Sequence, residues 1–128
     1  MAIRSLNGVG IHVVEDPARL AAGWLIHTAS EPGHIALSGG STIGRAYELA
    51  GDLQPEWRPD IHLWFGDERA VPPADERSNF RLVRENLLDR LRADPTVHRI
   101  HGELGAPDAA ELYERELDGV TFDLAMNG

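Results

Sequence analysis

Apolar and polar positions along this chain follow two alternating periods, one typical of strands and one typical of helices. Short runs of branched apolar residues predict strands, and apolar residues three or four positions apart predict helices. The expected strands are residues 10–15, 34–37, 61–65, 97–101 and 121–126. The expected helices are residues 17 to about 30, 43–50, 79 to about 92, and 107 to about 119.

Two of the expected helices begin with residues that favour a helix N-terminus. Asp16 precedes Pro17, which places a capping side chain before a proline in the first turn. Ser78 stands where its hydroxyl would cap the helix that starts at residue 79. These signals mark the entry to each helix more closely than the apolar period does.

Strands separated by helices of this length imply parallel pairing through right-handed crossovers. The predicted fold class is therefore α/β, a doubly wound and mostly parallel sheet with helices on both faces. Such sheets bind ligands at the carboxyl ends of their strands. Residues 38–42 and 66–77 both follow an expected strand directly, so we expect the functional site there.

The first loop, Ser-Gly-Gly-Ser-Thr at residues 38–42, has the composition of a phosphate-binding turn. Gly39 and Gly40 let the backbone approach an anion, and the helix behind them contributes positive partial charge. Ser41 and Thr42 add hydroxyl donors. The P-loop lysine and the dinucleotide-binding glycine spacing are both missing. The alternative interpretation is a plain strand-to-helix turn capped by Ser41.

The second loop carries adjacent charges of both signs. Asp67, Glu68 and Arg69 follow the strand at residues 61–65, and Arg77 and Asn79 come later. Carboxylates and arginines at a strand end are suited to acid–base chemistry and to binding an anion. The alternative is a solvated loop whose charges neutralise one another.

Composition excludes several classes of protein. The chain has 128 residues, no cysteine and a formal net charge of -9. Without cysteine there is no disulfide framework and no thiolate site, which is compatible with the cytoplasm, where we expect the protein. The acidic balance argues against nucleic acid as a partner. No apolar run is long enough to span a bilayer, and the first ten residues do not resemble a signal peptide. The six histidines lack zinc-site spacing, so no metal is expected. Nothing in the sequence indicates the oligomeric state.

Taken together, the two loops resemble the 6-phosphogluconolactonase family. Leu37-Ser-Gly-Gly-Ser-Thr42, with Tyr47 and Leu49 downstream, is similar to the family's first signature. Trp64-Phe-Gly-Asp-Glu-Arg-Ala-Val-Pro72, followed by Ser78-Asn79-Phe80, resembles the second.

The resemblance implies hydrolysis of 6-phosphoglucono-δ-lactone to 6-phosphogluconate in the pentose phosphate pathway, with a small sugar phosphate as partner and no cofactor. It assigns the substrate phosphate to Gly39, Gly40, Ser41 and Thr42. It places Asp67 at the position of the family's active-site aspartate and Arg69 at the lactone. Ser38, Glu68, Arg77 and Asn79 are further candidates for the substrate pocket.

The chain departs from the family pattern in two places. Ile43 stands where the family usually has proline. The family's general base is a histidine in a Gly-x-Gly-x-Asp-Gly-His segment, of which only the first glycine is matched, by Gly128. Residues 1–128 are thus expected to be the N-terminal part of a single sugar-phosphate isomerase/lactonase-like α/β domain, nearly inactive alone.

Two alternatives remain open. One is a phosphosugar-binding module without catalysis. The other is isomerisation or deamination of an amino-sugar phosphate, as in the related glucosamine-6-phosphate enzymes. Those enzymes usually have tyrosine after the Asp-Glu pair, where this chain has Arg69.

Overall fold

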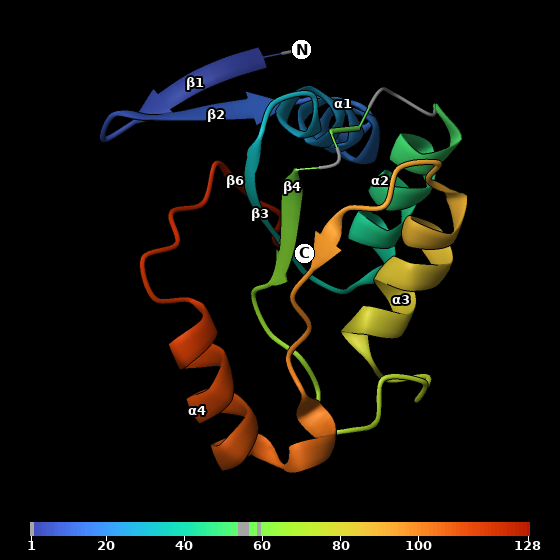
Figure 1. Cartoon of the computed structure of the whole chain (residues 1–128). Coiled ribbons are helices and arrows are strands. Elements are labelled where there is room, and N and C mark those ends of the chain that lie inside the picture. The colour runs from blue at the N-terminus through green and yellow to red at the C-terminus, as the bar shows by residue number, and fades with distance from the viewer. Residues whose placement is uncertain (1, 54–56, 59) are drawn as a thin grey trace.

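A parallel sheet forms the centre of the molecule in the computed structural model, which describes residues 2–53, 57–58 and 60–128 (Figure 1). Its four strands are β3 (Gly33–Leu37), β4 (Ile61–Phe65), β5 (Thr96–Val97) and β6 (Leu124–Ala125). The helices are α1 (Pro17–Ala29), α2 (Ser41–Asp52), α3 (Asn79–Asn86) and α4 (Ala106–Glu116), with short 3-10 turns η1 (Leu88–Arg90) and η2 (Gly102–Leu104). β1 (Ala2–Leu6) and β2 (Val9–Val13) form a separate hairpin.

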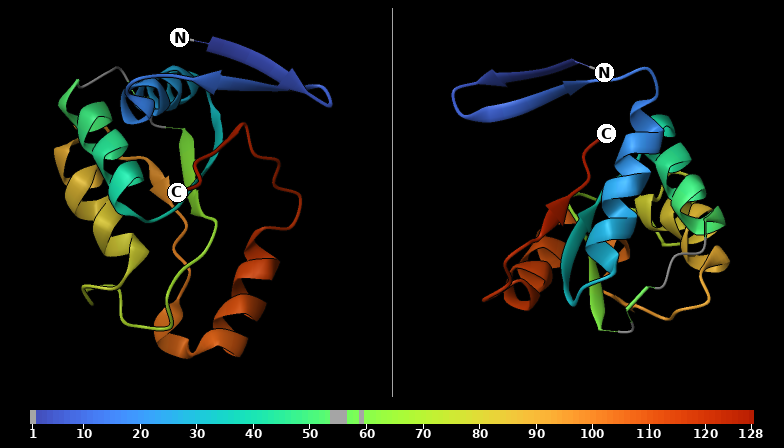
Figure 2. Two further views of the ribbon diagram at one scale, coloured as in Figure 1. Left: turned by 180° about the vertical axis from the view of Figure 1, so that it is seen from behind. Right: turned by 90° about the horizontal axis from the view of Figure 1, so that it is seen from above.

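The strand order is β5-β4-β3-β6, and every neighbouring pair is parallel. The chain runs outward from β3 through β4 to β5 and then returns to the other side of β3. α1, α2 and α3 cover one face of the sheet, and α4 lies on the other (Figures 1 and 2). The predicted fold class is confirmed. The reversal between β3 and β6 is the topological switch point at which sheets of this kind bind ligands.

Alternation along the strands divides the sheet into two different faces. Ile35, Leu37, Leu63 and Phe65 are at most 2% exposed and belong to the core under α1, α2 and α3. The intervening residues on β3 and β4 belong to the other face, because successive side chains of a strand point in opposite directions. The first face is apolar throughout, as expected for a parallel sheet covered by helices.

The second face carries a stack of aromatic rings. His34 and His62 lie 4.7 Å apart between ring centroids, and His62 and His98 lie 5.2 Å apart. Trp64 stacks on His98 at 3.8 Å, and its indole N–H donates to Nδ1 of His34 at 3.0 Å. Burial lowers the pKa of His98, and the neighbouring His62 lowers it further. This face therefore favours the neutral form of His98.

The expected strand at residues 10–15 is wrong in its pairing and its bounds. Val9–Val13 pairs antiparallel with Ala2–Leu6 and takes no part in the parallel sheet. Asn7 and Gly8 connect the two strands with φ of 51° and 81°, as a tight type I′ turn requires. The hairpin projects from the start of α1, away from the sheet (Figure 2). An Asn-Gly pair between apolar positions is a hairpin signal, and it was present in the sequence.

Three other expected elements are shorter than predicted. The helix expected to about residue 92 ends at Asn86, because Leu87 has a φ of -129°. The apolar period continues beyond it, since Leu88 and Leu91 still pack on the core. The expected strands at residues 97–101 and 121–126 are reduced to Thr96–Val97 and Leu124–Ala125, so the first of them also begins one residue earlier than predicted. The expected caps are confirmed: the side chains of Asp16 and Ser78 accept hydrogen bonds from backbone N–H groups one turn ahead.

Candidate functional site

The two loops singled out from the sequence meet at one edge of the sheet. Leu37 and Phe65 are partners across β3 and β4, so the loops that follow them begin side by side. Between the loops lies a cavity of about 310 Å³. Its lining consists of Ser38, Gly39, Gly40, Gly66, Asp67, Arg69, Asn79, Asn127 and Gly128. An alanine Cβ at residue 128 would lie 2.6 Å from the carbonyl oxygen of Gly39, so the residues that follow β6 lie against the first loop at the switch point.

The first loop offers unpaired donors to the cavity. Gly40 has φ 115° and ψ 156° and is the N-cap of α2, with no side chain capping the helix. The cap that the alternative interpretation assigned to Ser41 is therefore wrong. The hydroxyl of Ser38 is buried without a hydrogen-bond partner. A helix N-terminus that no side chain caps, beside an unpaired hydroxyl, is suited to an anionic group.

A tyrosine holds the start of the first loop. The hydroxyl of Tyr47 accepts from the N–H of Ser38 at 2.9 Å and donates to the C=O of Ser38 at 2.7 Å. The ring is fully buried, and burial raises the pKa of Tyr47 well above its ordinary range. Tyr47 belongs to the sequence motif of the first loop, and the structure gives it the task of fixing the backbone where that loop leaves β3.

A second tyrosine makes the same contact at the end of β4, from the opposite face of the sheet. The hydroxyl of Tyr113, on α4, accepts from the N–H of Phe65 at 2.7 Å and donates to its C=O at 2.9 Å. Burial raises the pKa of Tyr113 to about 12. Both loops thus start from backbone that a tyrosine hydroxyl fixes. No sequence pattern indicated this role for Tyr113.

Asn79 joins the two loops. Its side-chain N–H₂ donates to the backbone C=O and to Oδ1 of Asp67, at 3.2 Å each. Its Oδ1 lies so close to Gly39 that an alanine Cβ there would approach it to 2.1 Å. Asn79 is 5% exposed. The structure therefore places Asn79 between the carboxylate of Asp67 and Gly39 and Gly40 of the first loop, which we call the glycine turn.

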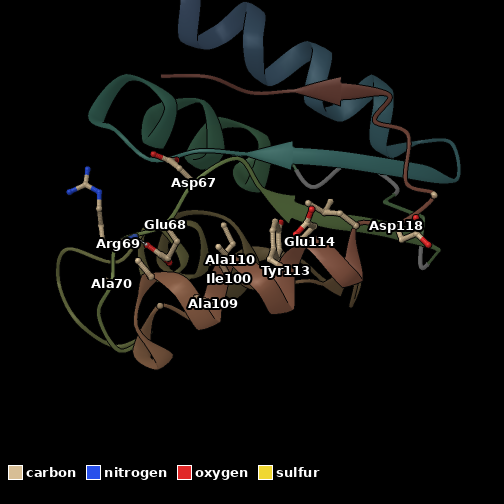
Figure 3. Close-up of a pocket in the computed structure, with 14 residues that line it drawn as sticks. Asp67, Glu68, Arg69, Ala70, Ile100, Ala109, Ala110, Tyr113, Glu114 and Asp118 are labelled. Carbon is tan, nitrogen blue, oxygen red and sulfur yellow. Dashed lines mark hydrogen bonds between the residues drawn. The ribbon is translucent and has the colours of Figure 1, made fainter.

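Glu68 and Arg69 point in different directions. The carboxylate of Glu68 accepts from Ser78, Asn79 and Phe80 at the start of α3 and does not line the cavity. Arg69 lines it with an exposed side chain. Figure 3 shows Asp67 and Arg69 extending away from α4. Asp67 and Arg69 are therefore the two charged side chains of this loop that reach the cavity.

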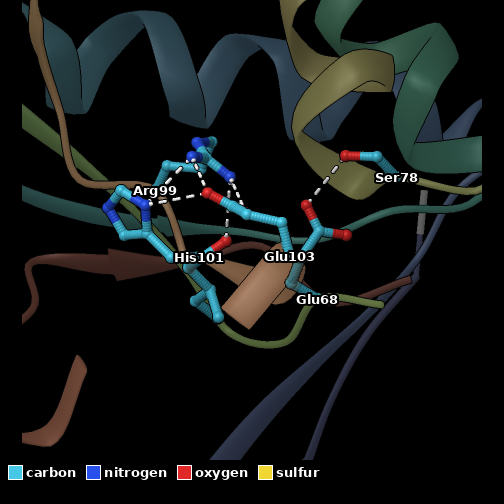
Figure 4. Close-up of polar contacts among 6 residues, drawn as sticks. Glu68, Ser78, Arg99, His101 and Glu103 are labelled. Carbon is cyan, nitrogen blue, oxygen red and sulfur yellow. Dashed lines mark hydrogen bonds and ion pairs between the residues drawn. The ribbon is translucent and has the colours of Figure 1, made fainter. Parts of the chain in front are cut away.

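The segment from residue 99 to residue 104 supports the second loop from behind. An alanine Cβ at position 102 would lie 2.1 Å from the carbonyl oxygen of Arg69, so only glycine allows this approach. Arg99 forms a two-pronged ion pair with Glu103 at 2.7 and 2.8 Å (Figure 4). That pair holds the pKa of Glu103 down at about 2. Glycine at position 102 is a further site-forming residue that the sequence reasoning missed.

Arg77 lies away from the cavity. Its guanidinium pairs with both carboxylate oxygens of Asp75 at 3.0 Å, and its side chain is 67% exposed. This ion pair lowers the pKa of Asp75 to about 2. The structure therefore groups Arg77 with the solvated, self-neutralised part of the loop. Ser41 and Thr42, in the first turn of α2, are both exposed and adjacent to the cavity lining.

A larger cavity of about 570 Å³ lies on the other side of the second loop (Figure 3). Alanines of α4 and the apolar side chains of Ile100 and Leu117 form much of its wall. It lacks the glycine turn and the unpaired donors, so the smaller cavity is the better candidate for a polar ligand. Among the described residues, no group of three or more histidines, aspartates or glutamates is placed to hold a metal ion. No helix within the described ranges is long and apolar enough to cross a membrane.

Known proteins are similar to this chain in sequence and in fold. Residues 18–128 match the sequence model of the family described as glucosamine-6-phosphate isomerases/6-phosphogluconolactonase. A 6-phosphogluconolactonase of Aggregatibacter actinomycetemcomitans is 33% identical over 118 residues, which cover 88% of this chain and 49% of that protein. One of Thermotoga maritima is 37% identical over 97 residues, covering 73% and 44%.

Solved structures are also similar to this chain in fold. A structure titled devB protein has a TM-score of 0.73 at 26% identity, over 86% of this chain and 54% of the other. The 6-phosphogluconolactonase of Thermotoga maritima gives a TM-score of 0.68 at 30% identity, over 82% and 54%. The chain spans about half the length of the curated relatives it matches. By its sequence match and its fold, this chain belongs to the glucosamine-6-phosphate isomerase/6-phosphogluconolactonase family.

Proposed function

We propose that this chain supplies the substrate-binding part of a 6-phosphogluconolactonase site, for hydrolysis of 6-phosphoglucono-δ-lactone to 6-phosphogluconate. The observation that carries the proposal is the meeting of the glycine turn, Asp67, Arg69 and Asn79 around one cavity at the switch point of the sheet. The relatives named 6-phosphogluconolactonase support it.

The glycine turn binds the substrate phosphate in this proposal. The uncapped N-terminus of α2 presents backbone N–H groups and positive partial charge to an anion. The hydroxyls of Ser38, Ser41 and Thr42 add donors around it. Local donors of this kind hold the phosphate despite the formal net charge of -9, since they act at contact distance, whereas surface charges are screened by salt.

The second loop acts on the lactone end. Attack of water on the lactone carbonyl develops negative charge on the carbonyl oxygen, and a nearby cation stabilises it. Arg69 supplies that cation, and Asp67 holds the attacking water with the orientation that Asn79 gives it. The resemblance assigns proton removal to a histidine, and no histidine of the described residues lines the cavity.

A second candidate is binding of a phosphosugar by this chain without turnover, which the same cavity supports. The two candidates share the cavity and differ in rate. Release of 6-phosphogluconate in a coupled assay distinguishes them, since binding without product formation supports the second. Ammonia release from glucosamine 6-phosphate would instead indicate the amino-sugar branch of the family.

Two arginines of the second loop make a matched test. Arg69→Gln should weaken calorimetric binding of 6-phosphogluconate about tenfold or more, because a charge-assisted contact in the cavity is lost. Arg77→Gln removes the same charge from the same loop but outside the cavity, and should leave binding unchanged. Equal effects of the two substitutions, or no binding by the unmodified chain, would contradict the proposal.

A further inference from the structure

The carboxylate of Glu68 accepts four hydrogen bonds from donors of the protein itself. It accepts hydrogen bonds from Ser78 Oγ at 2.9 Å, from the N–H of Asn79 at 2.6 Å and from the N–H of Phe80 at 2.9 Å. A further bond comes from the N–H of its neighbour Arg69 at 2.8 Å. Figure 4 shows the carboxylate directed at Ser78, at the entry to α3. Four donors leave this side chain little capacity for a ligand.

These contacts lie at the N-terminus of α3. The first N–H groups of a helix lack partners inside the helix and carry positive partial charge, so a carboxylate is favoured there. Glu68 reaches this N-terminus from 10 to 12 positions earlier in the chain. It therefore closes the second loop on itself and fixes the distance between Asp67 and the start of α3.

Asn79 connects Glu68 to the residues that line the cavity. Its backbone N–H binds Glu68, while its side chain binds Asp67 on one side and lies against Gly39 on the other. The contacts form one series, from Glu68 to Asn79 to Asp67. Asn79 is nearly fully buried, so its amide has little freedom to adopt another orientation.

We propose that Glu68 is a positioning residue, which holds Asn79 and through it the carboxylate of Asp67 in the orientation that faces the sugar end of the substrate. The role of that orientation rests on the proposed function. The hydrogen bonds of this series lie within the second loop and the start of α3, and the contact with Gly39 is one of packing only. Loss of Glu68 should therefore weaken recognition of the sugar much more than recognition of phosphate.

The test compares Glu68→Gln and Glu68→Asp with Glu76→Gln in the full 128-residue chain. Glu76 is an exposed glutamate of the same loop and serves as the matched control. Glu68→Gln should weaken binding of 6-phosphogluconate about tenfold and change binding of inorganic phosphate less than about twofold. The N–H groups of Asn79 and Phe80 should lose protection from hydrogen exchange. Glu68→Asp keeps the charge on a shorter arm and should give a smaller loss, and Glu76→Gln none.

The possible outcomes separate the two proposals. Unchanged exchange at Asn79 and Phe80, or unchanged 6-phosphogluconate binding where the parent chain binds it, overturns the positioning role. Equal loss of both ligands at an unchanged circular dichroism spectrum also overturns it, since Glu68 would then support the whole site. If the parent chain binds neither ligand, the proposed function fails, while the exchange data still decide whether Glu68 holds Asn79.

Discussion

The ends of β3 and β4 are held by the same contact in different surroundings. Tyr47, on α2, reaches the end of β3 from the apolar face and is fully buried in the core. Tyr113 reaches the end of β4 from the face that carries the histidine stack, and it is 8% exposed. In each case one hydroxyl pairs with both the N–H and the C=O of a single residue.

The difference between the two strand ends corresponds to a difference between the loops. The glycine turn after β3 presents backbone donors, and the contact of Tyr47 with Ser38 fixes the point where it leaves the strand. The loop after β4 presents side chains, and it takes further support from Glu68, Asn79 and the close approach of residue 102. A site that uses backbone can rely on the core, whereas one that uses side chains needs additional contacts to orient them.

We expect the largest loss of stability from a substitution at residue 102, which lies directly behind the second loop. Gly102→Ala should lower the free energy of unfolding by about 1–3 kcal/mol, because the new methyl group would overlap the backbone carbonyls of Arg69 and Val71. Urea denaturation measures this. Gly23→Ala, in α1 with nothing within 4 Å of the new methyl, is the control and should raise stability by about 0.5–1 kcal/mol. Equal stability of Gly102→Ala and the parent chain would remove this support from the comparison.

The two tyrosines give a direct comparison of the strand ends. Tyr47→Phe should cost about 1–3 kcal/mol of unfolding free energy, because it leaves the buried N–H and C=O of Ser38 without this partner. Tyr113→Phe should cost less, about 1 kcal/mol, since its surroundings are more open to water. Thermal and urea unfolding of both variants check the order. A larger loss for Tyr113→Phe would reverse our view of which end is better held.

The histidine stack should make the second face sensitive to pH. Burial and His62 lower the pKa of His98, only partly offset by Glu116, so the unfolded chain binds protons more readily than the folded one. The stability contribution is therefore present above the ordinary pKa of histidine and is lost as the pH falls below it. Between about pH 7 and pH 5, His98→Asn should flatten the decline in unfolding free energy by no more than about 1 kcal/mol. His27→Asn, at an exposed histidine, is the control. If His98→Asn leaves the dependence of unfolding free energy on pH unchanged, this account is contradicted.

Local patterns in the sequence were sufficient to predict the fold class, the helix caps and the two loops that line the cavity. Ser78 and Asp16 cap helices because a short polar side chain can reach the free N–H groups one turn ahead, which depends only on neighbouring residues. The parallel sheet follows from strand and helix lengths. The hairpin was also readable from Asn7 and Gly8, and the prediction missed it by fitting the N-terminus into the alternating pattern.

What the sequence determined by itself is therefore the set of elements, the two loops and the residue types available to them. Only the tertiary structure decided which of these residues face the cavity. Glu68 and Asp67 are adjacent in the chain, yet one caps α3 and the other lines the cavity. Arg69 and Arg77 share a loop and differ in the same way. Glu68 and Asp67 are held by contacts with residues ten or more positions away, and local periodicity carries no information about such contacts.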